Sequence, residues 1–151
     1  MFKNEVAAPN LTVLYDSSCG FCVSCRSWME QQPAYVSLRF VAARSALAAG
    51  LFPELTQEDA REELVVVTDT GDVYREASAW ILCLWALREY RPWALRLSAP
   101  ALLPFARQAF ELVSRNRKAI SRRLGLLPEP ELVEKLRGAA APTCSTAPAS
   151  T

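Results

Sequence analysis

Three cysteines lie within seven residues near the start of the chain, at Cys19, Cys22 and Cys25. The 151-residue sequence contains no histidine, which excludes Ser-His and Cys-His catalysis and histidine-ligated zinc. Acid–base chemistry must therefore come from Asp, Glu, Cys, Lys or Tyr side chains. A cysteine cluster in a chain without a secretory signal is more often catalytic or metal-binding than structural.

The pair Cys19 and Cys22 stands where a strand should end and a helix should begin. Helix N-termini carry unpaired N–H groups and a partial positive charge, which lower the pKa of a thiol there. We expect Cys19 to be exposed at the helix mouth and to act as nucleophile, with a pKa nearer about 7 than about 3.5. Cys22, one turn deeper, would resolve the mixed disulfide. Gly20 would let a partner backbone approach, and Phe21 would offer it an apolar contact.

Asp16 ends the predicted strand, three residues before Cys19. Its carboxylate could accept the proton of the resolving thiol, which would make Asp16 a catalytic residue. It could equally cap the turn through local backbone hydrogen bonds, as aspartates at such positions often do. The sequence leaves both hypotheses open.

Cys25 continues the cysteine stripe at the same spacing. It could be a redox partner of Cys22, a metal ligand or a small core residue, and core is the commonest place for a free cysteine. A structural zinc site would need a fourth ligand from Cys83 or Cys144, and three thiolates on one helical stripe make a poor tetrahedron. We therefore expect no metal.

Short β-rich runs and helical patterns alternate over the first ninety residues. Strands are predicted at 11–15, 36–41, 64–68 and 73–75, and helices at 19–32, partly at 42–51, from 56 and at 78–89. The first strand, helix and strand form a βαβ unit with a right-handed crossover. The sequence thus predicts an α/β fold, in which this unit, a β-hairpin and a helix share one central mixed sheet.

The C-terminal third is predicted to be helical. A helix over 100–124 ends at Gly125, and we expect one domain over 1–137 with a C-terminal helical extension. The Ala-, Pro-, Ser- and Thr-rich residues 138–151 are predicted to be a disordered tail. The same helix carries a cluster of basic residues that we interpret as having no acidic residue nearby. The cluster is either a solvated face or a contact surface for RNA, lipid or an acidic partner. Its members are Arg115, Arg117, Lys118, Arg122 and Arg123.

Composition limits the class of protein further. The chain is 51% hydrophobic and 22% charged, which excludes a disordered protein, and its net charge of +1 gives no argument for nucleic acid. No apolar window of 18 residues is present, so no transmembrane helix is expected. The first residues lack a basic region followed by an apolar run, so we expect no secretory signal and a cytoplasmic location.

The segment from Val13 to Cys22 resembles the Asp-x-x-Cys-x-x-Cys signature of the DCC family of thiol-disulfide oxidoreductases, a thioredoxin-like group. The resemblance extends over about 11–117 and includes weaker landmarks, at Gly71–Tyr74, Ala79-Trp80 and Ser114–Arg117. It implies a thioredoxin-like fold with Asp16, Cys19 and Cys22 as the functional residues. Ser17 stands where the family usually has Gly, and no proline directly precedes Leu64, where thioredoxin has a cis-proline.

The predicted function is a dithiol–disulfide oxidoreductase of the protein-disulfide reductase type. It would use no dissolved cofactor, because the cysteines themselves carry the electrons. Its partners would be a disulfide-containing protein or small-thiol substrate and an unidentified reductant, without nucleic acid. The alternative is a non-enzymatic thioredoxin-fold interaction module, whose basic helix binds a partner and whose cysteines are unused or bind zinc.

Overall fold

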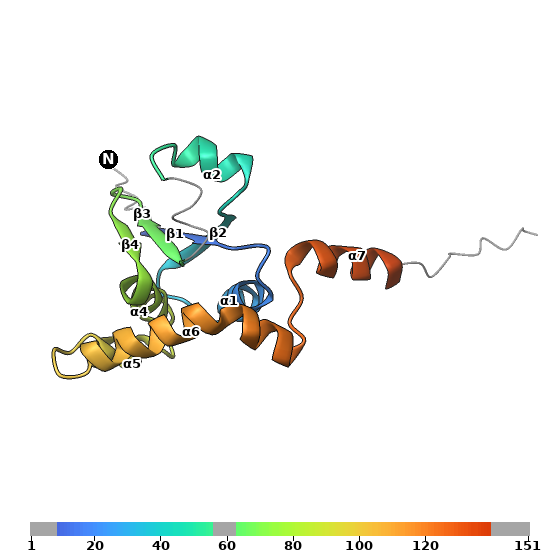
Figure 1. Ribbon diagram of the computed structural model, residues 1–151. Helices are drawn as coiled ribbons and strands as arrows, with labels where there is room; N and C mark the ends of the chain where they lie inside the picture. The colour runs from blue at the N-terminus through green and yellow to red at the C-terminus, as the bar shows by residue number, and fades with distance from the viewer. Residues whose placement is uncertain (1–8, 56–62, 140–151) are drawn as a thin grey trace, which may run out of the picture.

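A four-stranded mixed sheet forms the centre of the computed structural model, which describes residues 9–55 and 63–139 (Figure 1). The strand order is β2-β1-β3-β4, with β1 and β2 parallel and the other neighbours antiparallel. The strands are β1 (Asn10–Tyr15), β2 (Ser37–Ala42), β3 (Val65–Thr68) and β4 (Val73–Arg75). This is the arrangement of a thioredoxin-like α/β fold, and it confirms the predicted fold class.

The central strand β1 is buried on both faces. Leu11 and Val13 point into one core cluster and Leu14 into a second, as the period of two along a strand requires. Helix α2 (Ala46–Leu51) covers the second cluster, and Ser45 caps it by accepting a hydrogen bond from the backbone N–H of Ala48 at 3.1 Å. Because β1 is enclosed on both sides, its carboxyl end at Tyr15 is held firmly, and the cysteine motif follows there.

Helices α1 (Gly20–Glu30) and α4 (Glu76–Ala86) cover the other face. The helix predicted from Ser78 begins two residues earlier, because the chain turns out of β4 at Glu76, whose φ is +53°. It ends before Glu89, because Leu87 is extended and bridges to Ala34, while the N–H of Arg88 donates to the carbonyl of Pro33 at 2.8 Å.

The C-terminal third consists of α5 (Arg91–Leu97), α6 (Leu103–Leu124) and α7 (Glu129–Ala139). Figure 1 shows α6 lying across α1 and α4, while α7 extends away from the sheet. Gly125 ends α6 in the left-handed conformation, φ +65°, as predicted. Within the described residues, no helix is both long and apolar enough to cross a bilayer.

Two predicted segments lie partly or wholly outside the described residues. The predicted disordered tail 138–151 begins inside α7, which continues through Ala139, and the rest of that tail lies outside the described residues. The helix start predicted at 56–59 also lies outside them.

Candidate active site

The motif lies where β1 passes into α1, as the sequence predicted. Cys19 is the N-cap residue of α1, and its carbonyl accepts the first intrahelical bond, from the N–H of Val23 at 3.0 Å. Cys22 lies in the first turn. The helix has no side-chain cap of its own and no acidic residue in its first turn, so its terminal N–H groups are available to the site.

Asp16 is buried below this turn, with 5% of its surface exposed. Its Oδ1 accepts hydrogen bonds from the backbone N–H and the hydroxyl of Ser18, at 3.0 and 2.6 Å, so Asp16 does cap the turn. Its Oδ2 lies 3.6 Å from Nη2 of Arg117 on α6. The carboxylate therefore has a second partner beyond the turn.

Arg117 joins the carboxylate to the cysteines. Its side chain is only 11% exposed, and its Nη1 lies 4.0 Å from Sγ of Cys22. The interpretation of 115–123 as a cluster without a nearby acid is wrong at two positions, because Arg117 pairs with Asp16 and Arg115 pairs with Glu111 at 2.6 Å. Sequence reasoning missed the role of Arg117, although the resemblance at Ser114–Arg117 could have indicated it.

Ser121, one turn after Arg117, is the second polar residue that α6 contributes. Its hydroxyl accepts a hydrogen bond from the N–H of Phe21 at 2.9 Å, donates to the carbonyl of Arg117 at 2.7 Å, and lies 3.9 Å from Sγ of Cys19. Ser121 thus supplies the cap that α1 lacks. No local sequence signal marks it, because it is one serine within a long charged helix.

The two thiols have opposite acidities. The pKa of Cys19 is lowered to about 5, chiefly because the thiol of Cys22 donates a hydrogen bond to it; the backbone N–H of Cys22, the Ser121 hydroxyl and the Arg117 charge add to this effect and outweigh burial. The pKa of Cys22 is strongly raised by the same shared hydrogen bond and by burial. The value for Cys19 lies below the predicted 7, because the thiol of Cys22 donates a hydrogen bond to it and α6 adds two smaller contributions.

Cys19 is not exposed, contrary to the prediction, since only 4% of its surface is accessible. Residues 126–129, which lead from α6 into the first residue of α7, are here called the covering segment and contact the motif on both sides of Cys19. A Cβ at Gly20 would collide with the carbonyl of Leu126, and the N–H of Glu129 donates to the carbonyl of Ser17 at 3.0 Å. The backbone that Gly20 admits is therefore the chain's own.

Side chains hold the covering segment down. Glu129 accepts a hydrogen bond from the hydroxyl of Tyr15 at 2.8 Å and one from Nη1 of Arg26 at 3.2 Å. Burial and the neighbouring Glu129 raise the pKa of Tyr15 to about 12, so the phenol stays a donor. Phe21, expected to contact a partner, packs on Trp80, with ring centroids 6.3 Å apart.

The remaining described cysteines belong to the core. Cys25 packs against the core cluster that contains Cys83, and burial raises the pKa of Cys25 to about 11 and that of Cys83 to about 12. Both therefore remain neutral thiols, which supports the core interpretation of Cys25. In residues 9–55 and 63–139, no group of three or more Cys, Asp or Glu side chains could hold a metal ion.

No curated protein and no solved structure matches the chain. The family model of DCC1-like thiol-disulfide oxidoreductases matches residues 13–123, which span the second half of β1, the motif, the other three strands and α6 through Arg123. The match covers most of the chain and includes Asp16, Cys19, Cys22, Arg117 and Ser121, so this protein belongs to the DCC1-like thiol-disulfide oxidoreductase family.

Proposed function

We propose that the protein is a disulfide reductase in which Cys19 is the nucleophile and Cys22 the resolving thiol. The observation that carries this proposal is the asymmetry of the pair. The pKa of Cys19 is lowered to about 5 and that of Cys22 is strongly raised. At neutral pH the reduced site then holds one thiolate and one thiol in contact, which is the arrangement that dithiol exchange requires.

The first step is attack by the Cys19 thiolate on a substrate disulfide. A bond forms between Sγ of Cys19 and one substrate sulfur, and the other substrate sulfur leaves as a thiolate that takes a proton from water. Once Cys19 is in the mixed disulfide, it has no negative charge and is a weaker acceptor for the Cys22 proton. The main cause of the raised pKa of Cys22 is thereby removed.

The second step needs an acceptor for the proton of Cys22, and we assign this role to Asp16. Its charge contributes to the raised pKa of Cys22, and the Arg117 guanidinium contacts both groups. The Cys22 thiolate attacks Cys19, the second substrate thiol leaves, and the protein is oxidised to the Cys19–Cys22 disulfide. A thiol reductant, which we place in the cytoplasm, restores the dithiol.

The test is a trapping experiment. Cys19→Ser should abolish exchange with a model disulfide, because the low-pKa thiol is lost. Cys22→Ser should still be attacked but should accumulate a mixed disulfide on Cys19, which intact-protein mass spectrometry and peptide mapping detect. Cys25→Ala is the matched control and should keep wild-type exchange. An adduct on Cys22 in the Cys19→Ser variant would reverse the assigned order.

The lowered pKa of Cys19 predicts the reduction potential of the Cys19–Cys22 pair. The pKa of Cys19 is about 5, whereas that of the thioredoxin cysteine is about 7. This difference stabilises the reduced form at pH 7 by roughly 2 kcal/mol. For a two-electron couple this is roughly 50 mV, which moves the potential from about −270 mV to about −220 mV. Equilibration with glutathione redox buffers measures it. A value as oxidising as about −120 mV would contradict a reductase.

The pH dependence of Cys19 reactivity follows from its lowered pKa. Only the thiolate is alkylated, so the rate of labelling by iodoacetamide should rise through about pH 5 and level off above it. Arg117→Gln should shift this midpoint upward by about half a unit to one unit, because a nearby positive charge is lost. Arg123→Gln, an exposed charge in the last turn of the same helix, is the control. An unchanged midpoint in Arg117→Gln would remove Arg117 from the site.

Access to Cys19 should depend on the covering segment. Glu129→Ala removes the contacts to Tyr15 and Arg26, so we expect Cys19 to be alkylated about threefold to tenfold faster at pH 7, as loss of one or two partly exposed hydrogen bonds implies. Glu134→Ala, farther along α7, is the matched control. Equal rates in the two variants would show that the segment does not limit access.

A further inference from the structure

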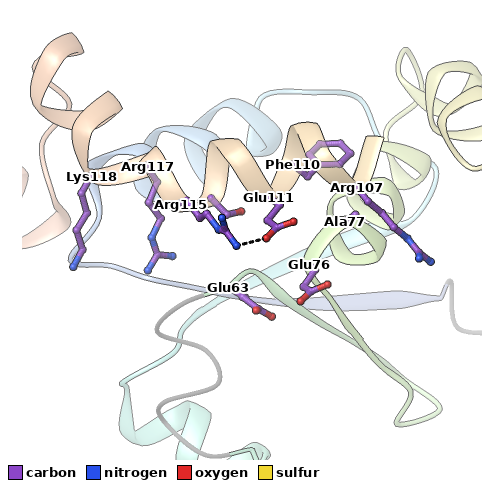
Figure 2. A pocket seen from close by; sticks show the side chains of 10 residues that line it. Glu63, Glu76, Ala77, Arg107, Phe110, Glu111, Arg115, Arg117 and Lys118 are labelled. Atoms are coloured by element: carbon purple, nitrogen blue, oxygen red, sulfur yellow. Dashed lines mark ion pairs between the residues drawn. The ribbon is translucent and has the colours of Figure 1, made fainter. Parts of the chain in front are cut away.

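A cavity of about 560 Å³ lies between α6 and the start of α4 (Figure 2). One wall is the face of α6 that carries Arg107, Phe110, Arg117 and Lys118. The opposite wall includes Glu63, directly before Leu64 and β3, and Glu76, at the start of α4. We call it the α6 cavity. Its volume suits a small organic ligand, and its charged lining suits one with charges of both signs.

Arg117 connects the α6 cavity to the cysteine site. The residue lines the cavity, and its guanidinium lies 4.0 Å from Sγ of Cys22 and 3.6 Å from Oδ2 of Asp16. The α6 cavity and the cysteine site therefore share Arg117 as a common wall. The cavity is thus adjacent to the cysteine site and not on a remote surface.

Two cations of α6 stand at opposite ends of the cavity. Arg107 and Lys118 are eleven residues apart, which is about 16 Å along a helix. Figure 2 shows them at either end, with Glu111 and Arg115 paired between them at 2.6 Å. Among the described residues, neither Arg107 nor Lys118 has a carboxylate within ion-pair distance. Both are thus available to bind the carboxylates of an elongated ligand.

The carboxylate of Glu76 adds a negative charge to the lining of the α6 cavity. It is the one described non-glycine residue with a positive φ, +53°, a conformation that glutamate rarely adopts. Such strain persists where the surrounding structure imposes it, and it concentrates at ligand sites. Glu76 forms no ion pair with another described residue, so its carboxylate can bind an ammonium group.

We propose that the α6 cavity binds the substrate of the reductase, and that this substrate is a small peptide disulfide with free carboxylate and ammonium groups. Arg107 and Lys118 bind its carboxylates, and Glu76 binds its ammonium group. This inference rests on the proposed function. The Cys19 thiolate attacks the bound disulfide, one half leaves as a thiol after protonation, and Cys22 releases the second half. Two electrons pass to the ligand, and a thiol reductant restores the protein.

Oxidised glutathione is the probe, because it carries both kinds of charge, and bis(2-hydroxyethyl) disulfide is the neutral comparison. The wild-type dithiol should react faster with oxidised glutathione than with the neutral disulfide, and this preference should fall in 0.5 M salt, about three times the physiological ionic strength. Arg107→Ala and Lys118→Ala should each slow the reaction with oxidised glutathione about fivefold and leave the neutral disulfide unaffected. Arg123→Ala, on the same helix outside the cavity, should change neither rate.

Glu76→Gln tests the contact with the ammonium group separately from the contacts with the carboxylates. It should slow the reaction with oxidised glutathione but not the reaction with 3,3′-dithiodipropionate, which has carboxylates and no ammonium group. Equal wild-type rates for the charged and neutral disulfides would overturn the inference and leave the proposed function standing.

Binding is tested separately from electron transfer. S-methylglutathione has the charges of the probe but no disulfide, and its titration into the full chain should shift the amide resonances of Glu76, Arg107 and Lys118. Those shifts should occur even if no disulfide reacts, an outcome that would refute the proposed function alone. Absence of the shifts would overturn the inference.

Discussion

The buried contact of Arg117 with Asp16 and Cys22 is the interaction on which the rest of the site depends. Two parts of the chain that are far apart in sequence meet there, namely the junction between β1 and α1 and the middle of α6. A buried carboxylate is costly unless a cation is nearby, and a buried guanidinium has the same requirement. Each residue thus permits the burial of the other. Their pairing fixes the position of α6 over α1.

That position adds to the acidity of Cys19, whose main cause is the hydrogen bond that the Cys22 thiol donates to it. The terminus of α1 alone would act on Cys19 as in any strand–helix junction of this kind. Helix α6 adds the Ser121 hydroxyl, which also completes the hydrogen bonding of Phe21, and the Arg117 charge. Cys22 completes the arrangement by donating its proton toward Cys19. The low pKa of Cys19 is consequently a property of tertiary packing as well as of the motif.

The local part of this site was predictable from the sequence, whereas the long-range part was not. Spacing and turn chemistry placed Cys19 at the cap of α1, and alternation placed the strands of the sheet. The exposure of Cys19 was predicted wrongly, because the covering segment begins more than a hundred residues later and no local pattern signals its return. Arg117 looked like one charge of a solvated face, since sequence spacing along α6 does not show which cation will meet a buried acid.

The distance in sequence between the motif and α6 has a consequence for the protein during its synthesis. Cys19 leaves the ribosome about a hundred residues before Arg117 and Ser121 do. Until α6 docks, the groups that it contributes to lowering the pKa of Cys19 are absent, and the thiol is less ionised at neutral pH. The nascent chain therefore presents a less ionised thiol than the finished domain, and the covering segment, which follows α6, does not yet lie over it.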